Sequence, residues 1–238
     1  MPHFYNMISA KTLAVVIPLV CGAALIVLFA SHREISFEEL TQENPLVVDR
    51  DKGEVRVLAI LEPEDFVKGS MPRYHAMVYR KGGAQSSALL KSFADDRAIF
   101  DALIKIGAVP GDNLTEDTWE ARYHESNPAP DRRIEGTPIE MLVYWEGLDE
   151  PISIENFFYD PQGKGLDLRF GGNKSLIPIW RSGCIVCLYS CPGSKIGNHE
   201  YTIRDYMKNT TAFSLKFEVL PQNKKTPVVV VFRLKSDE

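Results

Sequence analysis

The sequence predicts an α+β fold: a strand-rich, mainly antiparallel sheet with one or two helices, preceded by a single N-terminal transmembrane helix. Segments rich in β-branched and aromatic residues recur from residue 46 to residue 234. Helical periodicity is clear in only one long segment, and strands do not alternate with helices as in a doubly wound fold. An uncharged apolar run near the N-terminus accounts for the transmembrane helix.

The N-terminal apolar run extends from Thr12 to Ala30, 19 residues without a charge. At a rise of about 1.5 Å per residue, such a helix nearly crosses a hydrocarbon core of about 30 Å. Residues 1–33 are therefore predicted to form a tail and a transmembrane anchor, or an uncleaved signal. A cleaved signal peptide is the alternative, although Leu28 then precedes the cleavage site where a small residue is preferred. A lipoprotein signal ending at Cys21 fits less well, because the apolar run continues beyond it.

The anchor leaves most of the chain on one side of the membrane. The basic residues that flank it, Lys11 and Arg33, are nearly balanced and set no clear orientation. A short tail before the helix and a large domain after it are typical of an exported protein. We therefore expect a single-pass membrane protein with an extracytoplasmic domain, a cytoplasmic-facing domain being the alternative. Residues 34–44 are expected to form a stalk and residues 45–238 a single globular domain.

The first half of the domain contains two expected hairpins and one helix. LVVD at 46–49 and EVRVLAIL at 54–61 flank a turn that contains Gly53. A second hairpin is expected around Gly82 and Gly83, between RYHAMVY and SALLKSF. Asp95 or Asp96 can cap a helix through DDRAIFDALIKIG, which a glycine ends.

The second half is predicted to consist of strands. TPIEMLVYWEGL and PISIENFFYD flank a turn at 149–151, and the pattern continues in LDLRF, SLIPIW, AFSLKFEVL and TPVVVVFRL. Alternation and β-branched content are clearest in KFEV and VVVVF. These segments predict antiparallel pairing through most of the sheet.

Composition and missing motifs exclude several classes of function. Hydrophobic residues make up 45% of the 238 residues and charged residues 25%, as in a globular protein. The formal net charge of −5 argues against binding nucleic acid through its phosphates. The sequence has no Gly-x-Gly-x-x-Gly, P-loop, His-Glu-x-x-His or Gly-x-Ser-x-Gly motif. We therefore expect a carrier or a binding module rather than an enzyme, and no nucleic acid partner.

The segment SGCIVCLYSCPGSKIGNH carries the clearest chemistry. Cys184, Cys187 and Cys191 have the spacing Cys-x2-Cys-x3-Cys, and Pro192 follows directly. This is the end of the bacterial ferredoxin run Cys-x2-Cys-x2-Cys-x3-Cys-Pro, whose first cysteine would fall at Arg181. The three cysteines are therefore the candidate ligands of a metal or iron–sulfur centre.

Several interpretations of these cysteines stay open. His199 is the nearest candidate for a fourth metal ligand, although the sequence fits a surface histidine slightly better. Zinc is the alternative metal, because Cys-x2-Cys holds two thiolates close together. Cys184 and Cys187 could instead form a redox-active pair or a disulfide, or all three cysteines could be buried small side chains. His75, in an expected strand, could approach the cysteines, although a structural role is commoner for such a histidine.

Four segments carry a resemblance to a known family: NPLVVDRDKGEVRVLAIL, YHAMVYRKGGA, DALIKIGAVPGDN and GCIVCLYSCPGSKIGNHEYTIRD. Together they resemble the YdjY-like family, often described as ferredoxin-like, and the likeness covers most of residues 44–234. The resemblance implies an exported or membrane-tethered protein whose cysteine run binds a 4Fe–4S cluster. It implies little about mechanism, because the family is largely uncharacterised.

We therefore expect a membrane-anchored electron-transfer protein that holds an iron–sulfur or other metal centre through Cys184, Cys187 and Cys191. Its partner would be a membrane-associated redox protein. The alternative from another class is a non-enzymatic interaction or scaffold domain, in which the same cysteines form a structural zinc site or a disulfide.

Overall fold

The computed structural model describes residue 37 and residues 39–68, 73–123, 131–160, 162–207 and 212–235. The predicted anchor at 12–30 lies outside these ranges. Within them, no helix is both long enough and apolar enough to span a membrane. From Phe37 onwards the described residues form one structural unit.

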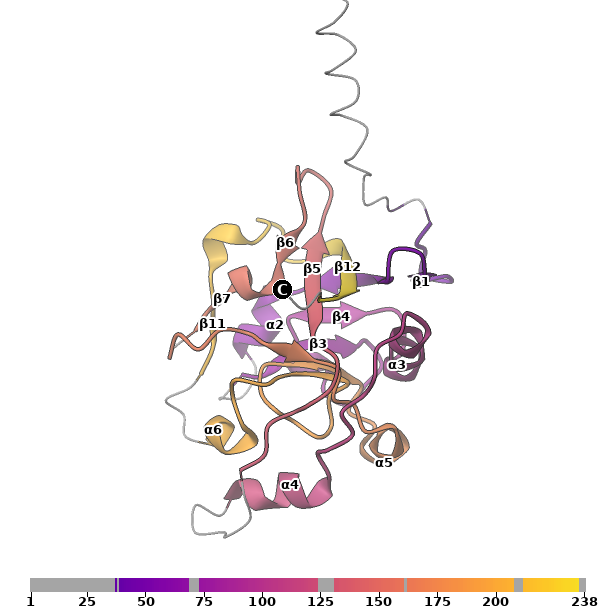
Figure 1. Ribbon diagram of the computed structural model, residues 1–238. Coiled ribbons are helices and arrows are strands. Elements are labelled where there is room, and N and C mark those ends of the chain that lie inside the picture. Colours follow the sequence, from indigo (N-terminus) through magenta and orange to yellow (C-terminus); the bar gives the residue numbers. More distant parts are fainter. Residues whose placement is uncertain are drawn as a thin grey trace, which may run out of the picture. The chain divides into compact units, whose positions relative to one another are not determined.

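A ten-stranded sheet is the frame of this unit (Figure 1). The strands of the chain are β1 (Leu46–Asp49), β2 (Glu54–Leu61), β3 (His75–Tyr79), β4 (Leu90–Ser92), β5 (Ile139–Tyr144), β6 (Ile152–Ser153), β7 (Phe158–Tyr159), β8 (Leu168–Arg169), β9 (Cys184–Cys187), β10 (Ile196–Asn198), β11 (Ser214–Leu215) and β12 (Thr226–Leu234). The large sheet has the order β6-β5-β12-β2-β4-β3-β9-β10-β8, with β1 also pairing with β2. β7 and β11 form a separate two-stranded sheet.

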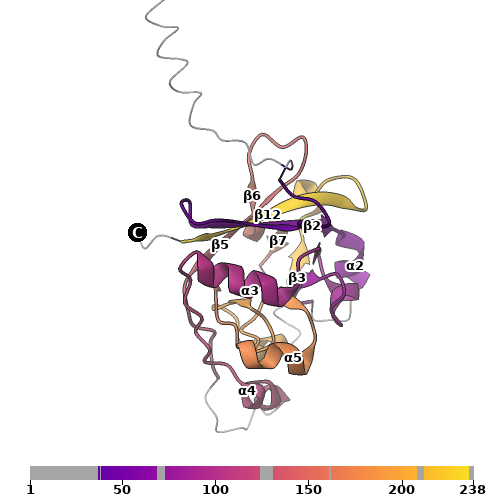
Figure 2. The same ribbon diagram turned by 90° about the vertical axis from the view of Figure 1, so that its right-hand side faces the viewer.

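The strands pair mostly antiparallel, as the sequence predicts, but the sheet is mixed. β3 runs parallel to β4, and β9 runs parallel to β10. The sheet also curls into a half-barrel (Figures 1 and 2). The predicted α+β class is therefore confirmed, with a more complex sheet than a series of hairpins.

The centre of the sheet is built from the most β-branched segments. β1 and β2 form the first predicted hairpin, with Gly53 in the turn at a φ of 64°. β12 pairs antiparallel with β2 on one side and with β5 on the other. Residues 228–232 of β12 are almost completely buried, which explains their continuous run of valine and phenylalanine.

The hairpin predicted around Gly82 and Gly83 is wrong. After β3 the chain passes through the 3-10 helix η1 (Gln85–Ser87) and enters β4 in the same direction as β3. The two glycines instead approach the segment before β9. The Gly83 N–H donates to the Arg181 carbonyl at 3.1 Å, and the Ala84 N–H donates to the Ser182 carbonyl at 3.0 Å. Residues without a Cβ serve here for the close approach of two backbones rather than for a tight turn.

The prediction of one or two helices is also wrong, since the described residues contain five short α-helices. These are α2 (Pro63–Lys68), α3 (Asp96–Lys105), α4 (Glu116–Glu120), α5 (Ile177–Trp180) and α6 (Ile203–Met207). Further 3-10 helices are η2 (Ala121–Tyr123), η3 (Ile154–Phe157), η4 (Lys174–Leu176) and η5 (Phe217–Val219). The predicted helix is confirmed as α3: Asp95 caps it by accepting from the Ala98 N–H, and Gly107 follows it with a φ of 98°. α3 packs against β1, β2 and β9, and Figure 2 shows it running beneath β2.

SLIPIW, predicted as a strand, is helical and forms η4 and α5. The Asn173 side chain accepts a hydrogen bond from the Ser175 N–H at 3.0 Å and starts the segment. Pro178 lies in the first turn of α5, where its missing N–H costs nothing, whereas it could not donate to a strand ladder. Arg181, at a left-handed φ of 50°, ends α5 and directs the chain into β9.

Candidate functional site

Cys184 and Cys187 are the first and last residues of β9, which lies inside the sheet between β3 and β10. In a regular strand, residues three positions apart point to opposite faces. β9 pairs irregularly with β3. Met77 and Val78 are adjacent in β3, yet they lie opposite Val186 and Cys184, so that Ile185 has no partner in β3. As in a β-bulge, the extra residue turns Cys184 to the face that Cys187 occupies.

The three cysteines predicted as ligands lie together. The thiols of Cys184 and Cys191 are the nearest side-chain neighbours that act on the thiol of Cys187. All three are free and buried, with exposed fractions of 3%, 0% and 6% in chain order. Burial, reinforced by the two neighbouring sulfurs, raises the pKa of Cys187 well above its ordinary value.

Cys191 lies in the loop between β9 and β10, where its thiol meets several donors. The hydrogen bond from Cys187, the backbone N–H groups of Gly193 and Ser194 and the nearby charge of Lys195 lower the pKa of Cys191, although burial opposes them. The Ser194 hydroxyl donates to the Cys191 carbonyl at 2.8 Å and holds the loop closed. Cys191 is therefore the more readily ionised partner of the Cys187–Cys191 pair.

A buried ion pair anchors this loop to α3. The Lys195 ammonium lies 2.5 Å from the Asp96 carboxylate, and their side chains are only 3% and 12% exposed. The same ammonium donates to the Gly193 carbonyl at 3.3 Å, and the Lys195 N–H donates to the Ile185 carbonyl at 3.2 Å. α3, the loop and β9 are thereby fixed to one another next to the cysteines.

A cavity of about 370 Å³ opens beside the thiols. Its lining combines cysteine, histidine and aromatic side chains: Tyr74, His75, Ala84, Trp119, Trp180, Ser182, Cys184, Cys191 and Gly193. The rings of Trp119 and Trp180 meet edge to face with centroids 5.7 Å apart, and Trp180 Nε1 donates to Glu116 Oε1 at 3.2 Å. An ion or cluster in this cavity would meet both thiols and indoles among the side chains that line it.

His75 reaches the same cavity from β3. It lies opposite Cys187 in the antiparallel pairing of β3 with β9, and it is 6% exposed. Its Nδ1 lies 2.9 Å from the Ser87 hydroxyl oxygen. Burial lowers the pKa of His75 to about 4, so its imidazole is neutral at neutral pH.

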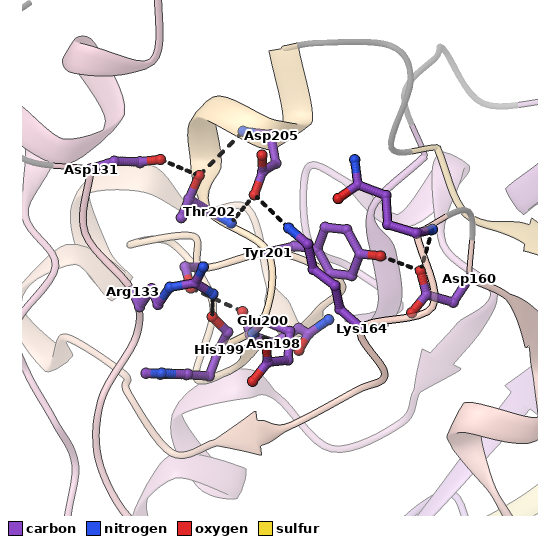
Figure 3. Close-up of polar contacts among 12 residues, drawn as sticks. Asp131, Arg133, Asp160, Lys164, Asn198, His199, Glu200, Tyr201, Thr202 and Asp205 are labelled. Carbon is purple, nitrogen blue, oxygen red and sulfur yellow. Dashed lines mark hydrogen bonds and ion pairs between the residues drawn. The ribbon is translucent and has the colours of Figure 1, made fainter.

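His199 lies elsewhere, directly after β10 (Figure 3). Its Nδ1 is 2.7 Å from the Ile134 carbonyl oxygen, and its own carbonyl accepts from Arg133 Nη1 at 2.6 Å. Its N–H donates to the Asp167 carbonyl at 2.8 Å. His199 is not among the residues that line the cysteine cavity. The structure thus brings the three cysteines together and seats His199 against backbone carbonyls.

The residues that follow His199 form a polar network (Figure 3). The Tyr201 hydroxyl donates to the Asp160 carboxylate, and the Thr202 hydroxyl donates to Asp131 at 2.6 Å. Burial, reinforced by the Asp160 hydrogen bond, raises the pKa of Tyr201 above its ordinary value. Burial alone would raise the pKa of Asp160, but hydrogen bonds from Tyr201 and from backbone N–H groups outweigh it and lower that pKa.

The donor set suits a thiolate-ligated metal. Cysteine thiolates are the ligands that iron–sulfur clusters and many zinc sites require, and N–H groups near sulfur, as at Cys191, are common around such clusters. Over the described part of the chain, no group of three or more His, Cys, Asp or Glu side chains is arranged to hold a metal ion as it stands. Ligation would therefore require the thiols to lose their protons and to turn towards a common centre.

The sequence did not point to Ser87 or Lys195, it suggested Asp96 only as a helix cap, and it favoured a structural role for His75. Lys195 lies in the cysteine segment itself, whereas Ser87, Asp96 and His75 come from other segments that no local spacing links to the cysteines. His75 could be found only by knowing the register of β3 against β9. The Asp96–Lys195 pair depends on α3 packing against β9, which a hydrophobic pattern does not specify.

Comparison with known proteins supports a family assignment. The model of the YdjY domain matches residues 46–233, which include all three clustered cysteines. "Uncharacterized protein YdjY" of Escherichia coli (strain K12) is 28% identical over 202 residues, covering 84% of each chain. No solved structure matches the chain. The family match spans nearly the whole described domain, and the chain therefore belongs to the YdjY domain family.

Proposed function

We propose that this chain is an electron-transfer protein in which Cys184, Cys187 and Cys191 hold an iron–sulfur centre. The observation that carries the proposal is that three buried, free thiols lie in one short segment, with Cys184 and Cys191 both acting on Cys187. Only one other cysteine, Cys21, exists in the chain, so three in eight residues are unlike a random use of small buried side chains. When bound, such a centre would accept and release single electrons.

The chain's own residues supply the environment of the centre. The N–H groups of Gly193 and Ser194 face the Cys191 sulfur and would favour its thiolate form. The cavity walls, with Trp119 and Trp180, would limit the access of water. These groups would hold the thiolates in place and tune the affinity of the centre for an electron.

The proposal includes a membrane location. The uncharged run at 12–30 would anchor the protein as a single pass, with the domain on the extracytoplasmic side and a membrane-associated redox protein as its partner. A cytoplasmic-facing domain is the alternative, and it would ease insertion of a cluster. Fusing a reporter enzyme that is active on only one side of the membrane to the C-terminus separates the two orientations.

Purification of the full-length chain in detergent without oxygen tests the metal centre. We expect iron and acid-labile sulfide together with a broad visible absorbance. Cys184→Ser, Cys187→Ser and Cys191→Ser should each reduce the iron content, whereas Cys21→Ser is the matched control and should not. A colourless wild-type protein without iron would overturn the proposal, and about one zinc per chain would instead support the scaffold alternative.

Thiol–disulfide chemistry is a second candidate, and the free, buried state of Cys187 and Cys191, which act on one another, favours it. The Cys191 thiolate would attack a disulfide of a partner protein and form a mixed disulfide, releasing one partner thiolate. The Cys187 thiol, after losing its proton, would then displace the second partner thiolate and leave a Cys187–Cys191 disulfide. Equilibration with a glutathione redox buffer, followed by mass spectrometry, should reveal a loss of two hydrogens confined to this pair. A pair that stays reduced throughout would exclude this chemistry.

A further inference from the structure

We infer that the cavity beside the cysteines binds a small, neutral, planar aromatic ligand that carries a hydroxyl group. The inference goes beyond the proposed function and does not depend on a metal centre. The cavity has a volume of about 370 Å³, whereas ligand sites typically span about 300–1,000 Å³, so we expect a ligand of one or two rings. Its lining also has the usual character of such sites, with apolar walls and a few polar groups.

Aromatic side chains form much of the cavity wall. Trp119 and Trp180 line it with their ring centroids 5.7 Å apart, and Tyr74 lines it from the segment before β3. Flat rings pack well against such side chains, either stacked or edge to face. Cys184 and Cys191 add polarisable sulfur atoms, which also favour contact with a ring. The wall therefore favours a flat ring over a branched or extended chain.

The wall offers no charged partner for an ionised ligand. Among the described lining residues, none has a carboxylate, an ammonium or a guanidinium group. Burial lowers the pKa of His75 to about 4, so its imidazole is also neutral at neutral pH. An ionised ligand would lose its hydration in the cavity without gaining a fixed opposite charge, which is costly. The ligand is therefore a neutral molecule.

His75 provides a hydrogen-bond acceptor in the cavity. Its Nδ1 lies 2.9 Å from the Ser87 hydroxyl oxygen, and that hydroxyl donates its own proton to the Ala84 carbonyl. The Ser87 oxygen therefore accepts from Nδ1–H, and Nε2 keeps its lone pair. Ser87 does not line the cavity, so the Nδ1 edge of the ring faces the protein and Nε2 remains for a ligand. The Tyr74 ring, with its centroid 3.9 Å from that of His75, helps to hold the imidazole in this orientation.

Ser182 provides a hydrogen-bond donor in the same cavity. Its hydroxyl oxygen accepts from the Cys184 N–H at 3.3 Å, which leaves the hydroxyl proton for a ligand. His75 and Ser182 thus offer one acceptor and one donor. An aromatic hydroxyl group can donate to the first and accept from the second, whereas a methyl group in its place can do neither.

Calorimetric titration of the full-length protein in detergent, with a thiol reductant present, tests the site. The probes are 2-naphthol and 2-methylnaphthalene, which share the same rings and differ in a hydroxyl or a methyl group. After correction for partition into detergent, we expect 2-naphthol to bind at least about 10-fold more tightly. His75→Phe and Ser182→Ala should each weaken the binding of 2-naphthol by about 2–10-fold, the effect of losing one hydrogen bond, without weakening that of 2-methylnaphthalene. Trp119→Leu should weaken the binding of both probes by a similar factor, because it removes part of the wall.

The imidazole of His75 gives a second readout. In protein labelled with ¹⁵N-histidine, 2-naphthol should shift the Nε2 resonance of one of the five histidines, and His75→Phe should lack that resonance. Circular dichroism checks that each variant is folded.

The outcomes separate this inference from the proposed function. Equal affinities for the two probes, a preference for 2-naphthol that His75→Phe leaves intact, or no binding of either probe would overturn the inference. Iron analysis of the same preparation tests the metal centre independently, so that either result can fail alone.

The same ring chemistry occurs in soluble phenols and in hydroquinones that carry an apolar tail. Titration with 1,4-naphthohydroquinone, with and without an isoprenoid tail, distinguishes the two sources. An affinity that the tail preserves or raises would support the site as one for a membrane hydroquinone. An affinity that the tail abolishes would support it as a site for a soluble phenol.

Discussion

Gly82 lies so close to Gly183 that a Cβ atom built on Gly82 would be 2.7 Å from the Gly183 Cα. It would also be 2.5 Å from the Ser182 carbonyl oxygen. Gly82→Ala must therefore separate two backbones at the start of β9, and we expect it to lower the free energy of unfolding by about 1–3 kcal/mol. Gly83→Ala is the matched control, since its Cβ would meet nothing closer than the Arg181 carbonyl oxygen at 3.5 Å. Urea unfolding measures both, and equal losses would contradict the packing described.

The Lys195–Asp96 pair predicts a large cost for removing one partner. Lys195→Met leaves a buried carboxylate without its counter-charge, and we expect a loss of about 3–5 kcal/mol in the free energy of unfolding. The double variant with Asp96→Asn should regain much of that loss. Lys174→Met is the control, because Lys174 pairs with Asp101 of α3 in an exposed position. This substitution should lower the free energy of unfolding by at most about 1 kcal/mol. A small effect of Lys195→Met would show that the pair is not buried in solution.

The thiol environment predicts an order of chemical reactivity. In reduced, metal-free protein, iodoacetamide should modify Cys191 well before Cys187, because the thiolate is the reactive form and the two pKa values are shifted in opposite directions. Lys195→Met should slow the modification of Cys191, since the Lys195 charge helps to lower that pKa. Peptide mass spectrometry over a time course gives the three rates. In denaturant the rates should converge, and a fast Cys187 in the folded protein would contradict the geometry.

The Tyr201–Asp160 hydrogen bond predicts how stability depends on pH. The folded-state pKa of Tyr201 is raised, so the unfolded chain loses its proton first and stability falls as the pH rises above about 10. The folded-state pKa of Asp160 is lowered, so its contribution is present above about pH 4 and is lost at more acidic pH.

Tyr201→Phe tests this dependence. It should cost about 1–3 kcal/mol at neutral pH, because a hydrogen bond to a charged group is lost. It should also lose less stability than the wild-type protein between about pH 9 and about pH 11. Unfolding midpoints across the pH range measure both effects. If Tyr201→Phe lowers the stability equally at every pH, the pKa of Tyr201 is the same in the folded and the unfolded chain, and the prediction fails.

The sequence was most informative where structure depends on local interactions. The first hairpin, with Gly53 in its turn, and the helix capped by Asp95 follow from turn chemistry, periodicity and a side-chain cap, and the structure confirms both. SLIPIW has the apolar content of a strand, and only the position of Pro178 signals a helix. Gly82 and Gly83 are as compatible with a hairpin turn as with a close backbone contact. Only the position of the segment before β9, which lies against them, distinguishes the two.

The candidate site shows the same contrast between residues fixed by local sequence and residues brought in from far along the chain. Spacing alone indicates that Cys184, Cys187 and Cys191 belong together, because a short segment keeps them close. Residues brought by other strands and helices, such as His75 and Asp96, depend on register and packing over long sequence separations. His199 is near the cysteines in sequence, yet it follows β10, where backbone carbonyls bind it.

The unpaired Ile185 has a consequence for recognising this site in other chains. In a regular strand, two cysteines separated by one residue share a face, whereas two cysteines separated by two residues do not. Because Ile185 is unpaired with β3, Cys184 and Cys187, which are separated by two residues, point to the same face of the sheet. A homologue that lacks this residue could therefore present the same pair of thiols from an undistorted strand. A pattern search that requires Cys-x2-Cys would overlook such a homologue. A better search accepts Cys-x2-Cys in a strand with a bulge and Cys-x-Cys in a strand without one.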